Sequence, residues 1–453
     1  MQAAAANPRP LWKTFLAFLA PLVLTNMLQA LSGTLNTVYI GRMLGIGALA
    51  SVASFFPLLM VFIAFVIGLG SGASVLVGQA WGAKNIERVR AIAGTVVCAG
   101  ALLGAAIGLC GFFLAGPLLR LLGTPADVLP DAIAYARVMM LFLPLLFVSV
   151  ITASVLRGVS DTVTPLLSLL VSSGAIMVLT PALIRGWTGL PPLGVTSGAW
   201  ATVMATALSL GWMVWHLRRR KHPIAPDGNF GPHWRIDRAL LRPVVRLGIP
   251  TGLFFVTSSL ADLALLSIVN SHGSQATAAW GAVSQVMAYV SFPAMSISIT
   301  ASVLAAQAIG AGRLAQVNDV THVGLGMNIA LTGGLALLVA LLAPYIVGLF
   351  ITDPDVVKLA ATLLHIAVLG PVLLGLGSVF SGVMRASGTV LVPTAITLSL
   401  LAFVLFPLGW MFNRLVGLPG IWMAHPTTYL IGLTLQACYF YGVWKKKPLR
   451  RLA

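Results

Sequence analysis

Charged side chains are scarce in this sequence, and acidic ones are the scarcest. Only 8% of the 453 residues are charged, and ten residues are Asp or Glu, whereas soluble globular domains carry about 25% charged residues. Hydrophobic residues make up 58% of the chain, and the mean hydropathy is +0.98. This composition excludes a soluble globular domain and indicates an integral membrane protein.

Cysteine and the motifs of catalysis are also nearly absent. The three cysteines, Cys98, Cys110 and Cys438, have no disulfide or metal-ligand spacing, so we interpret them as small core residues. The sequence contains no GKS/T, CxxC or HExxH motif and no convergent cluster of His, Asp and Glu. We therefore expect no cofactor, no metal and no enzymatic activity, and an ion gradient as the energy source for any pumping.

About twelve apolar stretches are long enough to cross a bilayer, since a spanning helix needs roughly 20 residues. The first one follows a short, weakly basic N-terminus and is too long for the apolar part of a signal peptide, so we expect it to stay in the mature protein. The sequence therefore predicts a multi-pass protein of the plasma (inner) membrane.

An internal duplication organises the chain. Residues 73–83 (ASVLVGQAWGA) and 301–311 (ASVLAAQAIGA) match at eight of eleven positions and lie 228 residues apart. The same offset relates Arg157 to Arg385 and Pro165 to Pro393. Each half then carries six spans, and a repeat of this kind outranks any local motif.

The repeat predicts the fold class and the domains. We expect an all-α membrane protein with twelve transmembrane helices in two pseudo-symmetric six-helix bundles, formed by residues 1–215 and 247–453. Residues 216–246, a basic polar segment, are the predicted cytoplasmic linker, and the stretch 235–246 is a candidate for lying on the membrane surface. Halves of like orientation have their symmetry axis along the membrane normal, with a transport route between them.

The net charge of +17 is explained by topology. If both termini are cytoplasmic, 21 of the 27 basic residues lie on the cytoplasmic side and six lie outside. Such an asymmetry follows the positive-inside rule and favours contact with anionic lipid over binding of nucleic acid.

The first span carries a polar stripe. Thr25, Gln29, Ser32 and Asn36 follow the spacing i, i+4, i+7, i+11, which places them on one helix face. Lipid cannot satisfy these groups, so the face must meet protein or a wet cavity.

Asp262 is the one acidic residue predicted to lie in the middle of a span, the seventh. A carboxylate there costs about 2.5 to 3.5 kcal/mol on insertion scales, which makes it a functional candidate as a proton carrier or cation site. Thr251, Ser258 and Asp262 repeat the stripe of the first span. The alternative is that Asp262 only bonds to a neighbouring helix and holds the bundle together.

Other intramembrane residues are candidates for the substrate cavity. His365 and His425 are titratable, although a lone His in an apolar helix is more often a packing residue. Aromatic and Met side chains of the second and eighth spans can form an adaptable surface for apolar ligands. The predicted cavity residues are Gln29, Gln285, Met287, Tyr289, Phe292 and His365.

Several motifs resemble those of the multidrug and toxic compound extrusion (MATE) transporters. They are residues 70–83 with their echo after the eighth span, 38–45 (VYIGRMLG), 156–162 (LRGVSDT) with 384–389 (MRASGT), and 194–202 (GVTSGAWAT). The resemblance covers essentially the whole chain, and two bundles of six helices are that family's architecture. It implies efflux of cationic or amphipathic organic compounds in exchange for protons or sodium.

The chain departs from the family pattern at the ion sites. Many members have an acid in the first helix where this chain has Asn36, and one sodium-coupled branch has acids that align with Ser258 and Leu374. Asp262 lies one helical turn after Ser258, on the same face. We therefore expect proton coupling through Asp262, Asn36 and Ser258, with sodium less favoured.

The first hypothesis is a proton-coupled antiporter that exports organic cations or amphipathic compounds by alternating access. Its partners are the substrate, the proton and the bilayer, and we expect a monomer. The alternative is a flippase for a lipid-linked or amphipathic metabolite, against which the few Arg and Lys within the spans argue. A major facilitator is a third hypothesis, but residues 79–85 lack that family's acidic and basic signature.

Overall fold

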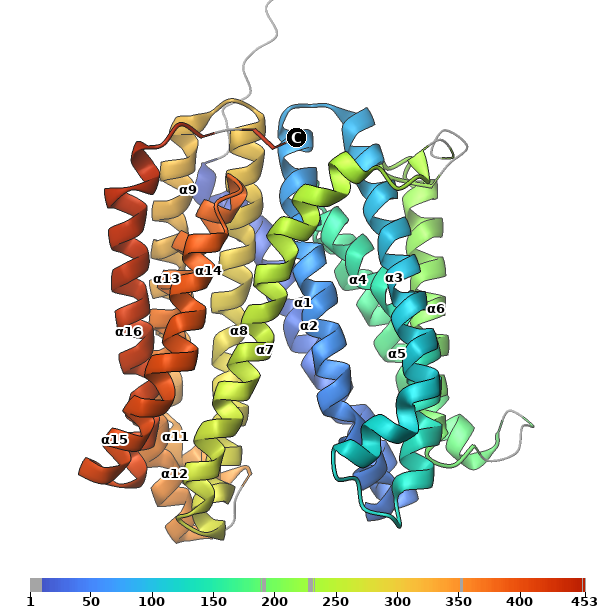
Figure 1. The fold of residues 1–453 in the computed structure, drawn as a ribbon, viewed down its shortest axis with the longest axis vertical. Helices are drawn as coiled ribbons and strands as arrows, with labels where there is room; N and C mark the ends of the chain where they lie inside the picture. The colour runs from blue at the N-terminus through green and yellow to red at the C-terminus, as the bar shows by residue number, and fades with distance from the viewer. Residues whose placement is uncertain are drawn as a thin grey trace, which may run out of the picture. The chain divides into compact units, whose positions relative to one another are not determined.

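The computed structural model describes residues 10–187, 189, 193–226, 231, 233–350, 353–449 and 451–452. Throughout this part of the chain the regular structure is helical, without a strand (Figure 1). The predicted all-α fold is confirmed.

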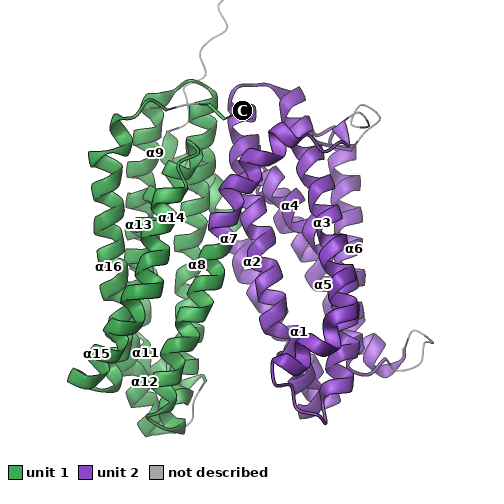
Figure 2. Ribbon diagram, viewed as in Figure 1, with its two compact units in different colours: residues 1–23, 253–452 green, residues 24–252, 453 purple. Residues whose placement is uncertain are grey.

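Contacts divide the chain into two units, which Figure 2 colours separately. Unit 1 comprises Met1–Val23 and Leu253–Leu452, and unit 2 comprises Leu24–Gly252 and Ala453. Two long helices, α1 (Leu11–Leu44) and α7 (Arg238–Asn270), therefore contribute residues to both units. The division into residues 1–215, 216–246 and 247–453 rests on the sequence repeat and stays a prediction.

Unit 2 is built from long helices that approach one another closely at glycines. A Cβ added at Gly104 of α3 (Ile86–Leu121) would lie 2.8 Å from the Cα of Pro144 of α4 (Leu129–Gly158), and one added at Gly108 would meet the carbonyl of Met140. Such contacts are how helices pack in lipid, where small residues let backbones approach. The remaining helices that lie wholly in unit 2 are α2 (Ile46–Gly82), α5 (Val163–Arg185) and α6 (Thr196–Arg219).

Unit 1 holds a large apolar core that includes Leu265, Trp280, Leu364 and Trp422. Two of its spans contain short π-helical segments, η2 and η3. Its elements after α7 are α8 (Ser274–Gly310), α9 (Leu314–Met327), η2 (Asn328–Gly333), α10 (Gly334–Leu341), α11 (Ala343–Gly348), α12 (Pro354–Ala367), α13 (Leu369–Ala386), α14 (Leu391–Leu400), η3 (Leu401–Leu405), α15 (Phe406–Val416), α16 (Leu418–Gly442) and the 3₁₀ turn η4 (Trp444–Lys446).

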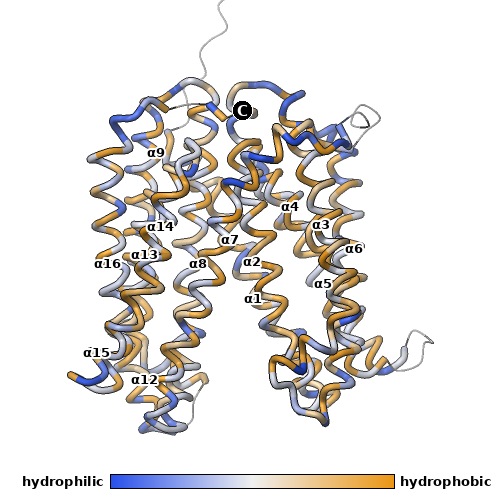
Figure 3. The backbone as a smooth tube through the Cα atoms, in the orientation of Figure 1, coloured by the Kyte–Doolittle hydropathy of each residue, from blue (hydrophilic) through white to orange (hydrophobic). Residues whose placement is uncertain are grey.

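In the described part of the chain, twelve continuous helical segments are long enough to span a membrane, as predicted. Ten of those described are also strongly apolar, and α6 and α16 are the two more polar ones. Hydrophobic residues follow the helices, while hydrophilic residues gather at helix ends and connections (Figure 3). This distribution fits helices whose middle turns lie in hydrocarbon.

The duplication is visible in the backbone. α2 and α8 have 37 residues each, and both of their ends are 228 residues apart. Residues with positive φ angles recur at the same offset, where turns repeat. The pairs are Gly45 and Gly273, Lys84 and Gly312, Ser160 and Gly388, and Gly189 and Gly417.

α5 runs past Pro181 to Arg185, where Gly186 caps it in the left-handed conformation (φ 71°). Two expectations about local structure were wrong. The stretch from Arg238 to Arg246 forms the first turns of α7, because the Asp237 carboxylate accepts a hydrogen bond from the Ala239 N–H (2.8 Å) and starts the helix there. Cys110 and Cys438 are exposed rather than in the core, since lipid accommodates a small apolar side chain as well as protein does.

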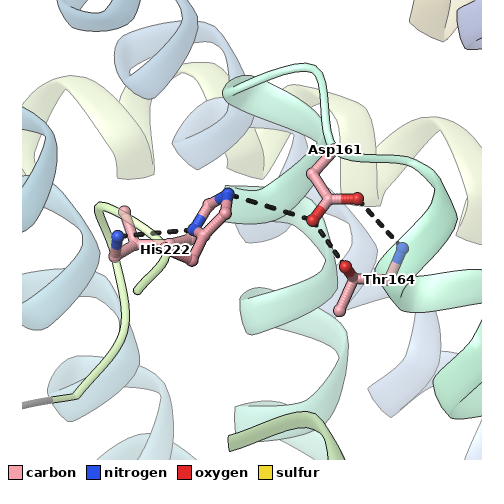
Figure 4. A network of polar contacts seen from close by, with 4 residues as sticks. Asp161, Thr164 and His222 are labelled. Carbon is pink, nitrogen blue, oxygen red and sulfur yellow. Dashed lines mark hydrogen bonds and ion pairs between the residues drawn. The ribbon is translucent and has the colours of Figure 1, made fainter. Parts of the chain in front are cut away.

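The connection between α6 and α7 is fastened to unit 2. Arg90 Nε donates to the Pro223 carbonyl (2.7 Å), and the Thr95 hydroxyl donates to the Arg235 carbonyl (3.0 Å). Near the same end of the unit, His222 Nε2 lies 3.9 Å from Asp161 Oδ2 (Figure 4). The described part of the predicted linker is therefore held against the helices of unit 2 by these contacts, and we call this connection between α6 and α7 the strap.

Candidate coupling and substrate site

Asp262 pairs with a histidine of another helix. His425 Nε2 of α16 lies 3.2 Å from Asp262 Oδ1 of α7, and both residues belong to unit 1. An ionised carboxylate can only accept, so the imidazole donates from Nε2. The pair joins an acid and a base on two helices of unit 1.

The pair lies toward one end of its helices. Asp262 is eight residues before the end of α7 at Asn270, a rise of about 12 Å. Because α7 begins at Arg238, Asp262 lies in the last third of that helix, and its place in the middle of the membrane span stays a prediction. The Asp262 side chain is 55% exposed, whereas that of His425 is 13% exposed.

Three aromatic rings surround His425. The ring centroids of Trp280, Trp422 and Tyr429 lie 6.3, 6.2 and 6.0 Å from that of the imidazole. The two tryptophans pack on each other at 4.3 Å and belong to the apolar core of unit 1. The imidazole of His425 is therefore packed among aromatic rings, and the Asp262 carboxylate is its hydrogen-bond partner.

Asn36 lies in unit 2 and is held by α5. Thr180, which is buried, donates its hydroxyl hydrogen to Asn36 Oδ1 (3.2 Å). One turn earlier, the hydroxyls of Ser32 and Ser173 share a hydrogen bond (2.5 Å). At these two positions the polar stripe of the first span meets protein, as predicted.

Ser258 is partly buried, one turn before Asp262 on α7. This placement agrees with the predicted common face.

The predicted cavity residues are only partly brought together. On α8, Tyr289 and Phe292 meet edge to face at 5.7 Å, Met287 packs against the core, and Gln285 is exposed. His365 of α12 bonds to the Ala361 carbonyl of its own helix through Nδ1 (2.6 Å). Gln29 is exposed and belongs to unit 2, whereas the other five belong to unit 1.

A groove elsewhere in unit 1 contains none of these residues. Leu391, Ile396, Leu400, Phe403 and Leu435 are among the apolar side chains of α14, η3 and α16 that line it. Its apolar lining fits hydrocarbon chains rather than a polar substrate.

His425 was recognised from the sequence as a titratable residue of a span, but it was not among the predicted coupling and cavity residues. The available signal was its type, because a titratable side chain inside a span is a functional candidate by default. Among the described residues no cluster of three or more His, Cys, Asp and Glu can hold a metal ion.

Comparison with known proteins identifies the family. The MatE family model matches the chain twice, over residues 21–182 and 250–411. The chain belongs to the MatE family. The two matched segments begin at Pro21 and Pro250, one in each repeat.

Relatives of this MatE protein match along nearly its whole length. It is 38% identical over 443 residues to "Probable multidrug resistance protein YoeA" of Bacillus subtilis (strain 168), covering 97% of this chain and 96% of the relative. It is 25% identical over 422 residues to the "FAD transporter" of Shewanella oneidensis, covering 92% and 90%.

Solved structures agree with the MatE assignment. A multidrug resistance MATE family transporter of the MOP superfamily in an outward-facing conformation has a TM-score of 0.87 at 20% identity, covering 96% of this chain and 97% of that one. The predicted two-lobe, twelve-helix fold is confirmed. This MatE protein is a multi-pass membrane transporter and not an enzyme.

Proposed function

We propose that the protein is a proton-coupled antiporter that exports cationic or amphipathic organic compounds by alternating access. The observation that carries this proposal is the contact between Asp262 and His425, an acid and a base 3.2 Å apart on two membrane helices. The name of the Bacillus subtilis relative, a probable multidrug resistance protein, supports the substrate class.

In the proposed cycle, ionised Asp262 attracts an organic cation from the cytoplasm. After the transporter opens outward, a proton from outside neutralises Asp262, and the cation leaves because its counter-charge is gone. The proton leaves Asp262 when the transporter faces inward again. One carboxylate thus holds either the proton or the cation, which is the requirement for exchange.

Asn36 and Ser258 are proposed to assist with uncharged oxygen atoms. Both replace acids of the family pattern, and neither can exchange a proton with water in the physiological range. Sodium coupling is less favoured because hard cations prefer several charged oxygen ligands. The side chain that takes up and releases the coupled proton is therefore Asp262, in unit 1.

The proposed substrate surface is the face of α8 around Tyr289 and Phe292, with Met287, Gln285 and His365 of unit 1 as further contacts. Aromatic rings bind organic cations through their faces, and Met adapts to differently shaped ligands. The proposed setting is the plasma membrane, with both termini cytoplasmic and one chain as the functional unit.

The test is transport in proteoliposomes. Efflux of a fluorescent organic cation is followed under an imposed proton gradient, with and without sodium, for the wild type and Asp262→Asn. We expect efflux to follow the proton gradient without sodium and to fall about 100-fold in the variant. Asp131→Asn, which changes an exposed acid in the first turn of α4, is the matched control and should transport normally.

Efflux that persists in Asp262→Asn would overturn the role of Asp262, and efflux that needs sodium would overturn proton coupling.

A second candidate function is movement of an amphipathic or lipid-linked metabolite, which the Shewanella oneidensis relative named FAD transporter favours. Proteoliposomes loaded with a flavin nucleotide give that candidate its own assay. Flavin movement without cation movement would establish it.

A further inference from the structure

Three buried polar atoms lie along one side of α16 beside the Asp262 pair. They are Trp422 Nε1, His425 Nδ1 and Thr428 Oγ1, and none has a hydrogen-bond partner among the described residues. Trp422 is 4% exposed and Thr428 is 1% exposed. A buried polar group without a partner is destabilising, and three neighbouring ones call for a shared partner.

The spacing of the three residues keeps their polar atoms close together. Positions 422, 425 and 428 are separated by three residues each, and residues three apart are neighbours on a helix surface. The rings of Trp422 and His425 have centroids 6.2 Å apart. A water molecule at hydrogen-bond distance from both can bridge such a gap.

The chemistry of the three atoms selects the ligand. Trp422 Nε1 only donates, and the Thr428 hydroxyl donates and accepts. His425 Nδ1 accepts while Nε2–H donates to Asp262, as in the neutral imidazole. A cation cannot accept from the indole N–H, and an anion cannot donate to Nδ1. Water does both.

We propose that Trp422, His425 and Thr428 bind one or two ordered water molecules, and that this water delivers the coupled proton to Asp262 through the imidazole. The inference rests on the proposed proton coupling and extends it to a defined path. His425 is the relay residue, and Trp422 and Thr428 are positioning residues that act through the water.

The proton transfer balances at each atom. A proton moves from the water to Nδ1, and the proton on Nε2 moves to Asp262 Oδ1, so the imidazole stays neutral while the carboxylate becomes neutral. The water regains its proton from the external solution, which is the source of the coupled proton. For the next cycle the imidazole returns to its first tautomer when Asp262 gives up its proton.

The proposed proton path uses only Asp262 and His425 among the titratable side chains near α16. Among the described residues, Asp262 and Tyr429 are the titratable side chains in contact with His425. On the helices packed against α16, Asp355 and Lys358 lie in the first turns of α12 and His365 bonds within that helix. Arg385 ends α13, and Arg414 of α15 stacks on Trp410 at 3.8 Å.

Thr428→Val tests the water because it removes the hydroxyl and keeps the shape of the side chain. If water binds there, the variant loses a hydrogen bond, so the melting temperature falls. Proton-driven efflux should also slow about fivefold, the factor for one hydrogen bond, with a shifted pH profile and an unchanged KM for the organic cation. If the site is dry, the same variant removes an unsatisfied hydroxyl and the melting temperature stays or rises, which would overturn the proposal.

Thr427→Val is the matched control, because that hydroxyl already donates to the Met423 carbonyl of its own helix (2.7 Å). Its pH profile should equal that of the wild type.

His425→Gln keeps a donor for Asp262 but lacks Nδ1, so the relay predicts slow efflux with substrate binding intact. Rapid proton-driven efflux in His425→Gln would overturn the relay while leaving the antiport proposal standing. Absence of proton-driven efflux in the wild type would instead overturn the antiport proposal.

Discussion

Gly68 of α2 and Gly248 of α7 meet backbone to backbone within unit 2. A Cβ added at Gly248 would lie 2.9 Å from the Gly68 carbonyl group, and one added at Gly68 would lie 2.8 Å from the Gly252 nitrogen. Real Cβ atoms essentially never come so close to backbone atoms. The first part of α7 thus packs directly against the backbone of α2, because both helices have glycine at the contact.

Gly68→Ala is therefore expected to destabilise unit 2 by on the order of 3 kcal/mol, since neither backbone can yield like a flexible side chain. Thermal unfolding in detergent measures the effect. Gly211→Ala is the control, because a Cβ at that helical position has no atom within 4 Å and alanine is the better helix former. Equal melting temperatures for the two variants would contradict the tight contact.

Asp262 and His425 should behave as one unit in a double-mutant cycle. Asp262→Asn and His425→Gln are each expected to reduce gradient-driven efflux about 100-fold, and the double variant should lose little more, because each change already breaks the same transfer. Initial efflux rates at several pH values supply the data. Losses that multiply would show that the two side chains act separately.

Asn36→Ala is expected to weaken unit 2 without changing the titration of transport. Loss of the bond from Thr180 costs about 1 kcal/mol, and an amide does not titrate. Efflux should slow severalfold, while the pH of half-maximal efflux stays at the wild-type value. A displaced pH profile, like that expected for Thr428→Val, would place the coupled proton in unit 2.

Hydrophobic periodicity and the internal repeat predict the helices of this protein, because periodicity is a property of one helix and the repeat relates one half of the chain to the other. They give the twelve segments, the 228-residue offset and the polar face that holds Ser32 and Asn36. They do not say which helices are neighbours. The partner of Asp262 is 163 residues away in the chain, so His425 could be named as titratable but could not be joined to Asp262. The same limit hid the exposed positions of Cys110 and Cys438, because apolar residues suit lipid and core equally.

The strap between α6 and α7 should loosen as the pH falls. Burial lowers the pKa of His222, the Asp161 carboxylate partly offsets this effect, and His216 adds to the lowering. The folded state therefore holds this proton less readily than the unfolded chain. The docked form is fully stable above the ordinary His pKa of about 6.5 and loses stability as the pH falls below it.

Hydrogen exchange of residues 220–226 at pH 7.5 and 5, corrected for intrinsic rates, checks this expectation. Exchange should quicken at the lower pH in the wild type and respond less in His222→Asn. His322→Asn, which changes a histidine of α9 in unit 1, serves as the control. The same pH response in wild type and His222→Asn would assign the effect to another group.

The division of α1 between the two units has a consequence for biosynthesis. Phe18 and Leu22, near the start of the chain, pack against Val303 of α8 within unit 1. The ribosome must add about 280 further residues before that partner exists. Unit 2 can form its contacts as its helices enter the membrane in order, but the opening turns of α1 have to wait in the bilayer until much of the second half is inserted.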